Sequence, residues 1–500
     1  MYPPTQDNIL FLFSTAIILV SLTAFVIAVF ASKWTTKPML IIILLVSSMT
    51  AYFMNSYHVV IDHDMIRNMI QTDIQESVDL FSFKQVLYFI FLGLIPAYVV
   101  YKIPIAYRSF KKEFMSKIKY LFVLAMVMVL TVLSFYKFYS SFAREHKPLR
   151  YSTNPTYWIY SVGSYINTTF TSGPIKIKAL GRDAKVLKEK YESPKIVILV
   201  VGEATRADHF SLNGYHRETT PQLKQEDIVN FSNVYSCGTS TAISVPCMFS
   251  YYGKSDYSYK KGLYTENVLD VLNHTNEISI LWKDNNSDSK GVALRVPFMY
   301  YKNNFYNKVC IEGECRDEGM LGDLDTYITE QKGKDILIVL HQMGNHGPAY
   351  YKRYPKAFEK FTPVCKTNQL EACTQEEIRN AYDNAILYTD DFLAKTITLL
   401  KKYNTTHKTA MIYISDHGES LGENGIYLHG LPYFMAPKAQ VHIPAFMWAN
   451  ETFRDSLSLD KIDTTKKYTH DNLFHTLLGL FSVQTEVYNP TLDIFNTTKD

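Results

Sequence analysis

The first feature of this sequence is the uneven distribution of its apolar residues. As far as about residue 140 the chain is mostly apolar, with long apolar runs at about 8–32, 38–61, 85–101 and 120–136. The first two runs reach the ~20 residues that a helix needs to cross a bilayer, and the last two lie at the short end of that range. A single run of this kind could be a core helix of a soluble protein. Four in succession favour a membrane domain over residues 1–140 with about four transmembrane helices.

A different pattern begins near residue 195, where short runs of branched apolar residues alternate with helical patterns. The runs are KIVILVVG, ISILW, DILIVL and MIYI, and each is typical of a strand buried in a parallel sheet. The clearest helix is expected at about 375–402, where Thr374 and Glu377 form a capping box, and another at about 470–481. The alternation predicts an α/β domain with a mostly parallel sheet over residues 195–500.

The four expected strands all end on residues that bind metal or charge. In chain order these are Glu203, then Lys283 to Asn286, then His341 and His346, then Asp416 and His417. Ligands of open α/β sheets collect beyond the carboxyl ends of the strands, so we expect one active site that contains metal. Alone, Glu203 would be an ordinary strand-end carboxylate, whereas the Asp416-His417 pair already favours a metal. We interpret the histidines without further support as structural: His209, His341, His442 and His470.

The charges of the loops predict the orientation in the membrane. Residues 102–119 carry six basic side chains against one acidic side chain, so this connection is expected in the cytoplasm. Residues 62–83 are acidic on balance and fall on the opposite side. With four spans, the N-terminus and the C-terminal domain both lie outside the cytoplasm. Residues 141–194 indicate a linker whose Tyr and Trp suit the membrane surface, although a plain helical connector fits equally well.

Composition and cysteine positions agree with that orientation. The net charge is only +3 and no basic face is concentrated, which gives no case for binding nucleic acid. All six cysteines lie in the soluble part, in three close pairs: Cys237/Cys247, Cys310/Cys315 and Cys365/Cys373. Zinc-finger spacing is the alternative, but no CxxC or paired-His pattern accompanies these cysteines. We expect three local disulfides in an oxidising compartment, the periplasm.

A loop rich in hydroxyl groups, SCGTSTAISVPC, lies between the first and second expected strands. A hydroxyl is a poor nucleophile near neutral pH unless a base or a metal lowers its pKa. A metal held by Glu203, Asp416 and His417 could do so, and zinc suits that mixture of carboxylate and imidazole ligands. Spacing alone does not choose among the candidate nucleophiles, which are Thr239, Ser240, Thr241 and Ser244.

The motifs of the C-terminal part resemble those of a known family. VVGEATRADHFSLNGY, NVYSCGTSTAISVPCMFS, LWKDNNSDSKG, HQMGNHGPAYYKRY, AYDNA and SDHGESLGENGIYLHGLP together look like the lipid A phosphoethanolamine transferases, including the mobile colistin-resistance enzymes. The resemblance covers nearly all of residues 195–482 and implies the alkaline phosphatase/sulfatase fold. It places the nucleophile on Thr241 and the main zinc ligands on Glu203, Thr241, Asp416 and His417. Residues around the phosphoethanolamine group, or around a second zinc, fall on Asn286, Lys290, His346, Glu419 and His429.

The resemblance also implies a reaction and a location. Phosphatidylethanolamine would donate phosphoethanolamine to a phosphate of lipid A through a phosphoethanolamine-threonine intermediate, which confers resistance to polymyxin and colistin. One zinc would be held firmly and a second during turnover. We expect a monomer in the bacterial inner membrane with its catalytic domain in the periplasm. The family usually has five membrane helices, so four here favour a start site further upstream over the loss of a helix.

Three alternatives remain beside this interpretation. A related transferase could use another acceptor of the cell envelope: a core sugar, a periplasmic glucan or a surface protein. A sulfatase would carry a Cys or Ser in a C/S-x-P-x-R string, which the loop around Thr241 lacks. A non-catalytic membrane sensor could keep zinc for structure, but the nucleophile and every ligand type are present.

Overall fold

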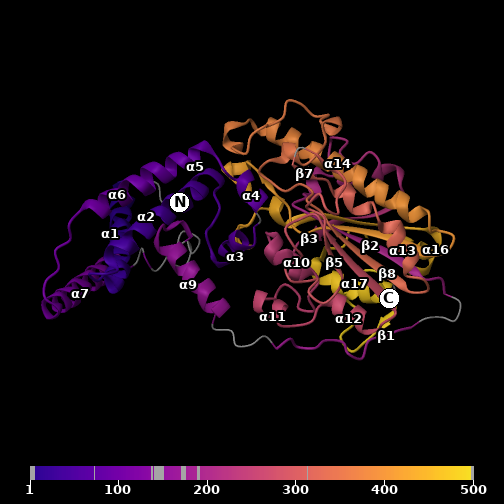
Figure 1. Ribbon diagram of the computed structural model, residues 1–500, viewed down its shortest axis with the longest axis horizontal. Helices are drawn as coiled ribbons and strands as arrows, with labels where there is room; N and C mark the ends of the chain where they lie inside the picture. The colour runs from indigo at the N-terminus through magenta and orange to yellow at the C-terminus, as the bar shows by residue number, and fades with distance from the viewer. Residues whose placement is uncertain are drawn as a thin grey trace. The chain divides into compact units, whose positions relative to one another are not determined.

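The computed structural model describes residues 6–72, 74–136, 139, 151–170, 176–187, 192–311 and 313–496. The chain forms two compact units (Figure 1). The first comprises Met1–Ile66 and Phe81–Thr169, and the second comprises Arg67–Leu80 and Phe170–Asp500. The segment Arg67–Leu80 therefore belongs by its contacts to the second unit, although it lies between two apolar helices in the sequence.

The first unit contains the long apolar helices, and four of them within the described residues are long and apolar enough to cross a membrane. They are α1 (Gln6–Phe30), α2 (Thr36–Tyr57), the continuous run of α5 (Phe83–Tyr88), η1 (Phe89–Leu94) and α6 (Ile95–Lys102), and α7 (Phe110–Ser134). A fifth helix, α9 (Thr156–Phe170), follows in the expected linker. The predicted four apolar helices are thus confirmed.

One boundary in this unit differs from its prediction. The fourth helix begins at Phe110 and not at about residue 120, so it includes most of the basic stretch expected to be a loop. Lysine has a high helix propensity, and a helix does not need apolar residues at an end that lies outside the bilayer. The apolar run therefore marks only the part of α7 suited to lipid, and the connection before it shortens to residues 103–109.

The second unit is built on an eight-stranded sheet with the order β13-β3-β12-β9-β2-β8-β4-β5. The four predicted strands are neighbours at its centre: β9 (Lys408–Ser415), β2 (Lys195–Gly202), β8 (Asp335–His341) and β4 (Ile278–Asp284). They pair in parallel. The remaining strands are β3 (Ile228–Tyr235), β5 (Phe298–Tyr300), β12 (His442–Ala449) and β13 (Tyr468–Thr469), and β12 alone in this sheet is antiparallel to its neighbours.

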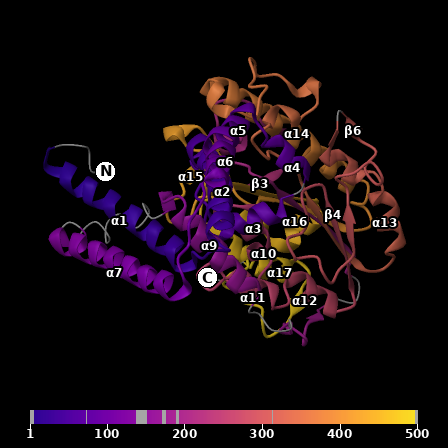
Figure 2. The same ribbon diagram turned by 60° about the vertical axis from the view of Figure 1, so that its left-hand side comes forward.

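Helices cover both faces of this sheet. The long helix α14 (Gln375–Lys401) lies on one face and begins with the predicted capping box of Thr374 and Glu377. On the other face α10 (Thr241–Met248), α12 (Val268–His274) and α17 (Leu473–Leu480) pack with every second residue of the strands in one apolar core. Figures 1 and 2 both show α14 on the opposite side of the strands from these three helices. The predicted α/β domain with a mostly parallel sheet is confirmed.

The register of the central strands brings their carboxyl ends into line. Gly202 of β2 pairs with Ser415 of β9, and Val201 pairs with His341 of β8. His341 in turn pairs with Asp284 of β4. The residues that follow these positions therefore emerge side by side at one edge of the sheet.

Candidate functional site

Glu203, Asp416 and His417, which follow the aligned strand ends, form a buried cluster with Thr241, and we call these four residues the closed cluster. Glu203 and Asp416 each follow a central strand, and Thr241 is the first residue of α10. The Thr241 hydroxyl donates to Glu203 Oε2 over 3.1 Å and lies 3.4 Å from His417 Nε2. Of the hydroxyls that the sequence left open, Thr241 is thus the one in contact with both a carboxylate and an imidazole of the cluster.

The closed cluster concentrates charge away from water. Glu203, Asp416 and His417 have no exposed surface. Burial and the negative charge of Glu203 raise the pKa of Asp416 to about 6. Burial lowers the pKa of His417, but Asp416 and Glu203 outweigh that effect and raise it to about 10. Two buried carboxylates beside one imidazole would therefore be stabilised by a positive charge at this position.

Two oxygen atoms of the closed cluster are suited to a metal ion. Within the described residues neither Glu203 Oε1 nor Asp416 Oδ2 makes a hydrogen bond. Each lies close to His417 Nε2, at 3.4 and 3.3 Å. Buried carboxylate oxygens normally have partners, and one ligand atom from each of these three residues lies within 4.8 Å of the others. The donor set of two carboxylates and one imidazole fits zinc, with room for one more ligand.

Neighbouring groups hold the closed cluster in place. Asn286 donates from Nδ2 to Glu203 Oε2 and to the carbonyl of Gln342, both over 2.8 Å, so its amide supports a carboxylate. Asp416 accepts through Oδ1 from the backbone N–H groups of Ala204 and His417. These bonds leave Asp416 Oδ2 directed at His417 and fix the carboxylate that carries it.

A second set of predicted residues lies next to the closed cluster and comes from loops. The His429 ring centroid is 4.3 Å from that of His417 and 6.0 Å from that of His346. His429 Nδ1 lies 2.7 Å from Glu419 Oε2. We call His346, Glu419 and His429 the open arm, because its two histidines are only half-buried. All three of His417, Glu419 and His429 can present ligand atoms within 4.8 Å of one another.

Lys290 lies on the loop after β4, and its contacts are with Ser287 and Gln71. Its backbone has a positive φ of 51°, and its ammonium group donates to Ser287 Oγ over 2.7 Å. The ammonium also lies 3.4 Å from the carbonyl of Gln71. Gln71 is part of the segment Arg67–Leu80, so this segment reaches the loop that carries Lys290.

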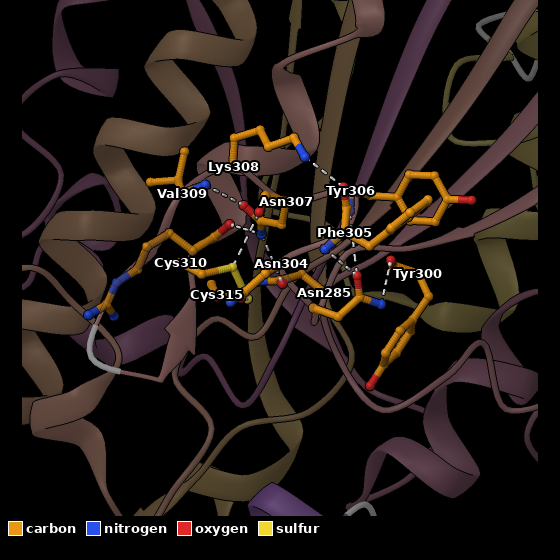
Figure 3. Close-up of a disulfide and its surroundings, with 12 residues drawn as sticks. Asn285, Tyr300, Asn304, Phe305, Tyr306, Asn307, Lys308, Val309, Cys310 and Cys315 are labelled. Atoms are coloured by element: carbon orange, nitrogen blue, oxygen red, sulfur yellow. Dashed lines mark hydrogen bonds between the residues drawn. A yellow bond between two sulfur atoms is a disulfide. The ribbon is translucent and has the colours of Figure 1, made fainter.

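The cysteines pair as predicted, in the disulfides Cys237–Cys247, Cys310–Cys315 and Cys365–Cys373. The first encloses Thr241 between its two cysteines. The second closes a short hairpin whose Cys315 carbonyl accepts from Asn285 Nδ2 over 2.9 Å. Figure 3 shows this disulfide with Asn285 and Asn307 beside it. Asn285 precedes Asn286, so this disulfide hairpin is connected to the residue that supports Glu203.

Two of the histidines interpreted as structural lie directly behind the closed cluster. His470 accepts at Nδ1 from the N–H of Cys237 and donates at Nε2 to the carbonyl of Ser415. Burial lowers the pKa of His470 to about 4, which keeps this ring neutral. His341 is fully buried and lies 2.8 Å through Nδ1 from Asp284. His470 thus joins the loop that carries Thr241 to the end of β9.

Several residues that matter for this geometry were missed from the sequence. Tyr350 donates to Glu419 Oε1 over 2.7 Å, and Arg353 donates from Nε to the carbonyl of His346 over 2.7 Å. Arg206 donates to the carbonyl of Glu419. Tyr350 and Arg353 both occur in the motif HQMGNHGPAYYKRY, whose aromatic and basic residues were the available signal.

Comparisons with known proteins agree with this fold. Residues 195–483 match the Sulfatase family, and residues 19–170 match the family Phosphoethanolamine transferase EptA/EptB. The phosphatidylethanolamine transferase Mcr-2 of Escherichia coli is 44% identical over 96% of this chain and 90% of its own length. The integral membrane lipooligosaccharide phosphoethanolamine transferase A (EptA) from Neisseria meningitidis superposes with a TM-score of 0.93 at 35% identity, covering 99% of this chain and 92% of that one.

A further solved structure resembles the second unit alone. The C-terminal periplasmic domain of EptC from Escherichia coli, in complex with Zn, is 23% identical, with a TM-score of 0.53 over 65% of this chain and 91% of that domain. That likeness supports the fold of the second unit. The full-length relatives additionally match the membrane helices, so this chain is an integral membrane protein with a periplasmic catalytic domain. It belongs to the phosphoethanolamine transferases, a membrane-anchored family with the sulfatase fold.

Proposed function

We propose that this enzyme transfers phosphoethanolamine from phosphatidylethanolamine to a phosphate of lipid A, through a covalent intermediate on Thr241. The observation that carries the proposal is the position of the Thr241 hydroxyl, 3.1 Å from Glu203 and 3.4 Å from His417, beside two buried carboxylate oxygens suited to a metal. The relatives named for phosphatidylethanolamine and lipooligosaccharide support the donor and the class of acceptor.

In the first step Thr241 Oγ attacks the phosphorus of the donor lipid. The bond between phosphorus and the diacylglycerol oxygen breaks, and phosphoethanolamine remains on Thr241. The Thr241 proton, which the hydroxyl donates to Glu203, is lost, and the diacylglycerol oxygen gains one. We assign the transfer of that proton to His346 and His429, the half-buried histidines beside the closed cluster.

Two sources of positive charge would stabilise the negative charge of the phosphoethanolamine group during transfer. Zinc, when bound by the closed cluster, would lower the pKa of the Thr241 hydroxyl and withdraw charge from the phosphoryl oxygens. Lys290 supplies a fixed positive charge from the loop after β4, held by Ser287. Cationic groups that meet developing charge in a buried site stabilise the transition state.

In the second step a phosphate oxygen of the acceptor attacks the same phosphorus and releases Thr241. The hydroxyl regains its proton, and lipid A leaves with an added phosphoethanolamine. The ethanolamine amine offsets part of the negative charge of the acceptor. Cationic peptides such as polymyxin and colistin should then bind the outer leaflet less strongly, which is the expected route to resistance.

The test is mass spectrometry of lipid A from a polymyxin-sensitive host that expresses the chain. We expect a mass gain of one phosphoethanolamine with the natural chain and none with Thr241→Ala. Ser244→Ala is the matched control, since this hydroxyl lies on the same helix and accepts from the N–H of Gly238. Unmodified lipid A in all three strains, with the protein inserted and folded, would point to another envelope acceptor. Modification that persists in Thr241→Ala would remove Thr241 from the nucleophile's role.

A further inference from the structure

A chain of hydrogen bonds leads from a buried tyrosine to the open arm. Tyr350 donates its hydroxyl to Glu419 Oε1 over 2.7 Å. The other oxygen of the same carboxylate, Glu419 Oε2, lies 2.7 Å from His429 Nδ1. Both oxygens of Glu419 are therefore engaged, one by a phenol and one by an imidazole.

The chemistry of these groups fixes the direction of each bond. A carboxylate only accepts hydrogen bonds, so His429 carries a proton on Nδ1 and donates it to Glu419. Burial and the charge of Glu419 raise the pKa of Tyr350 well above 10, so its hydroxyl keeps its proton and donates. Among the residues that the structure describes, none forms a hydrogen bond with His429 Nε2, the nitrogen that can bind a metal or contact a phosphoryl oxygen.

Packing holds this arrangement with little room for change. Tyr350 is 1% exposed, and its ring meets that of Tyr382 edge to face with centroids 5.4 Å apart. A Cβ on Gly347 would lie 2.7 Å from Glu419 Oε1 and 2.8 Å from the Tyr350 hydroxyl. Arg206 donates to the backbone carbonyl of Glu419 over 3.3 Å. Contacts to the Glu419 backbone and to both of its carboxylate oxygens therefore restrict the position of this side chain.

Two roles are open to Glu419, and the contacts favour one. As a direct ligand beside His417 and His429, Glu419 would have to share an oxygen already bonded to Tyr350 or to His429. As an orienting group it needs no rearrangement. Carboxylates that accept from the second nitrogen of a ligating histidine are common around metal sites and fix the tautomer of the ring.

We propose that Tyr350 is a positioning residue, which holds Glu419 so that its carboxylate orients His429 and directs His429 Nε2 at the metal or phosphoryl group. The inference rests on the proposed function, and it gives Glu419 an orienting role in place of a ligand's role. Loss of such an outer partner typically costs about 10–100-fold in metal affinity or activity.

The test compares Tyr350→Phe with Tyr354→Phe in the full-length protein. Tyr354 is a matched control, since it is 3% exposed, lies on the same loop and makes its side-chain hydrogen bond with Asn384, away from the site. For Tyr350→Phe we expect kcat/KM to fall about 10–100-fold and zinc to be lost at a lower chelator concentration. Tyr354→Phe should stay within a few-fold of the natural chain in both measurements, and both variants should melt at similar temperatures.

A double variant tests whether Tyr350 acts through Glu419 or only stabilises the surrounding loop. If Tyr350 acts through Glu419, then Tyr350→Phe combined with Glu419→Gln should be no less active than Glu419→Gln alone. Effects that multiply, or a Tyr350→Phe that behaves as Tyr354→Phe does, would overturn the inference. The proposed function would fail by a different result, namely a natural chain that leaves lipid A unmodified. In that case the chelator measurement would still report on the orientation of His429.

Discussion

The closed cluster and the open arm are neighbours, but they are built in different ways. Glu203 and Asp416 are set by the ends of adjacent parallel strands, so their positions follow from the register of the sheet. His346, Glu419 and His429 lie on loops, and their positions depend on side chains such as Arg353 and Tyr350. The closed cluster is therefore fixed by the sheet. The geometry of the open arm, and with it the affinity for substrate or a second metal, can change through substitutions of residues outside the site.

The largest expected effect comes from breaking the closed cluster. Asp416→Asn removes a buried negative charge that faces His417, so zinc should not be retained and activity should fall by more than the ~100-fold typical of outer partners. Zinc content of the purified protein and transfer from a labelled phosphatidylethanolamine measure this. Asp390→Asn is the control, because this buried carboxylate of α14 accepts from the N–H groups of Gln222 and Leu223, which are not part of the closed cluster. Retained zinc in Asp416→Asn would contradict the ligand assignment.

A smaller effect is expected outside the closed cluster. Lys290→Gln removes the positive charge that we propose stabilises the transferring phosphoryl group, and we expect kcat/KM to fall by about 10–100-fold while zinc in the closed cluster stays bound. Lys261→Gln, an exposed lysine that contacts the carbonyl of Asp256, should leave both unchanged. Loss of zinc together with activity in Lys290→Gln would show that Lys290 also supports the closed cluster.

The smallest effect on the reaction is expected from the ion pairs of the segment Arg67–Leu80. Asp79 lies 2.5 Å from Lys352 and 2.6 Å from Arg353, and Arg353 also binds the carbonyl of His346. Asp79→Asn should raise KM only a few-fold, because Arg353 keeps Glu314 as a partner. It should lower the free energy of unfolding by about 1–3 kcal/mol. Glu314→Gln, which removes the other carboxylate partner of Arg353, is the control.

The same variant has a defined pH dependence. Burial raises the pKa of Asp79, but Arg353 and Lys352 outweigh it and leave the pKa lowered. The stabilisation is therefore present above the pKa of the unfolded state and is lost as the pH falls through the lower value. Unfolding measured from neutral to acid pH should show this loss in the natural chain and less of it in Asp79→Asn. Equal slopes would mean that the ion pair contributes little.

The sequence predicted the closed cluster better than the open arm for a physical reason. A buried parallel strand is a short apolar run, and the residue after it must lie at the sheet edge, so Glu203 and Asp416 could be placed by pattern alone. His346 was indicated only by its place beyond the end of an expected strand and by the family resemblance. His429 lies on a loop whose course has no local signal, and the resemblance alone indicated it. Tyr350 and Arg353 act through contacts distant in the sequence, which no local pattern expresses. The start of α7 was misplaced because hydropathy reports lipid exposure and not helix length.

The grouping of residues 67–80 with the catalytic unit has a practical consequence for drug discovery. A truncated protein that begins after the membrane helices would lack Asp79, and also Arg67, whose guanidinium stacks 3.7 Å from the ring centre of Tyr259. Such a fragment would present Lys352, Arg353 and Tyr259 as bare surface. Anionic or aromatic compounds selected against it would then occupy positions that the intact enzyme fills with its own chain. Inhibitor screens should therefore use the complete protein in detergent or nanodiscs.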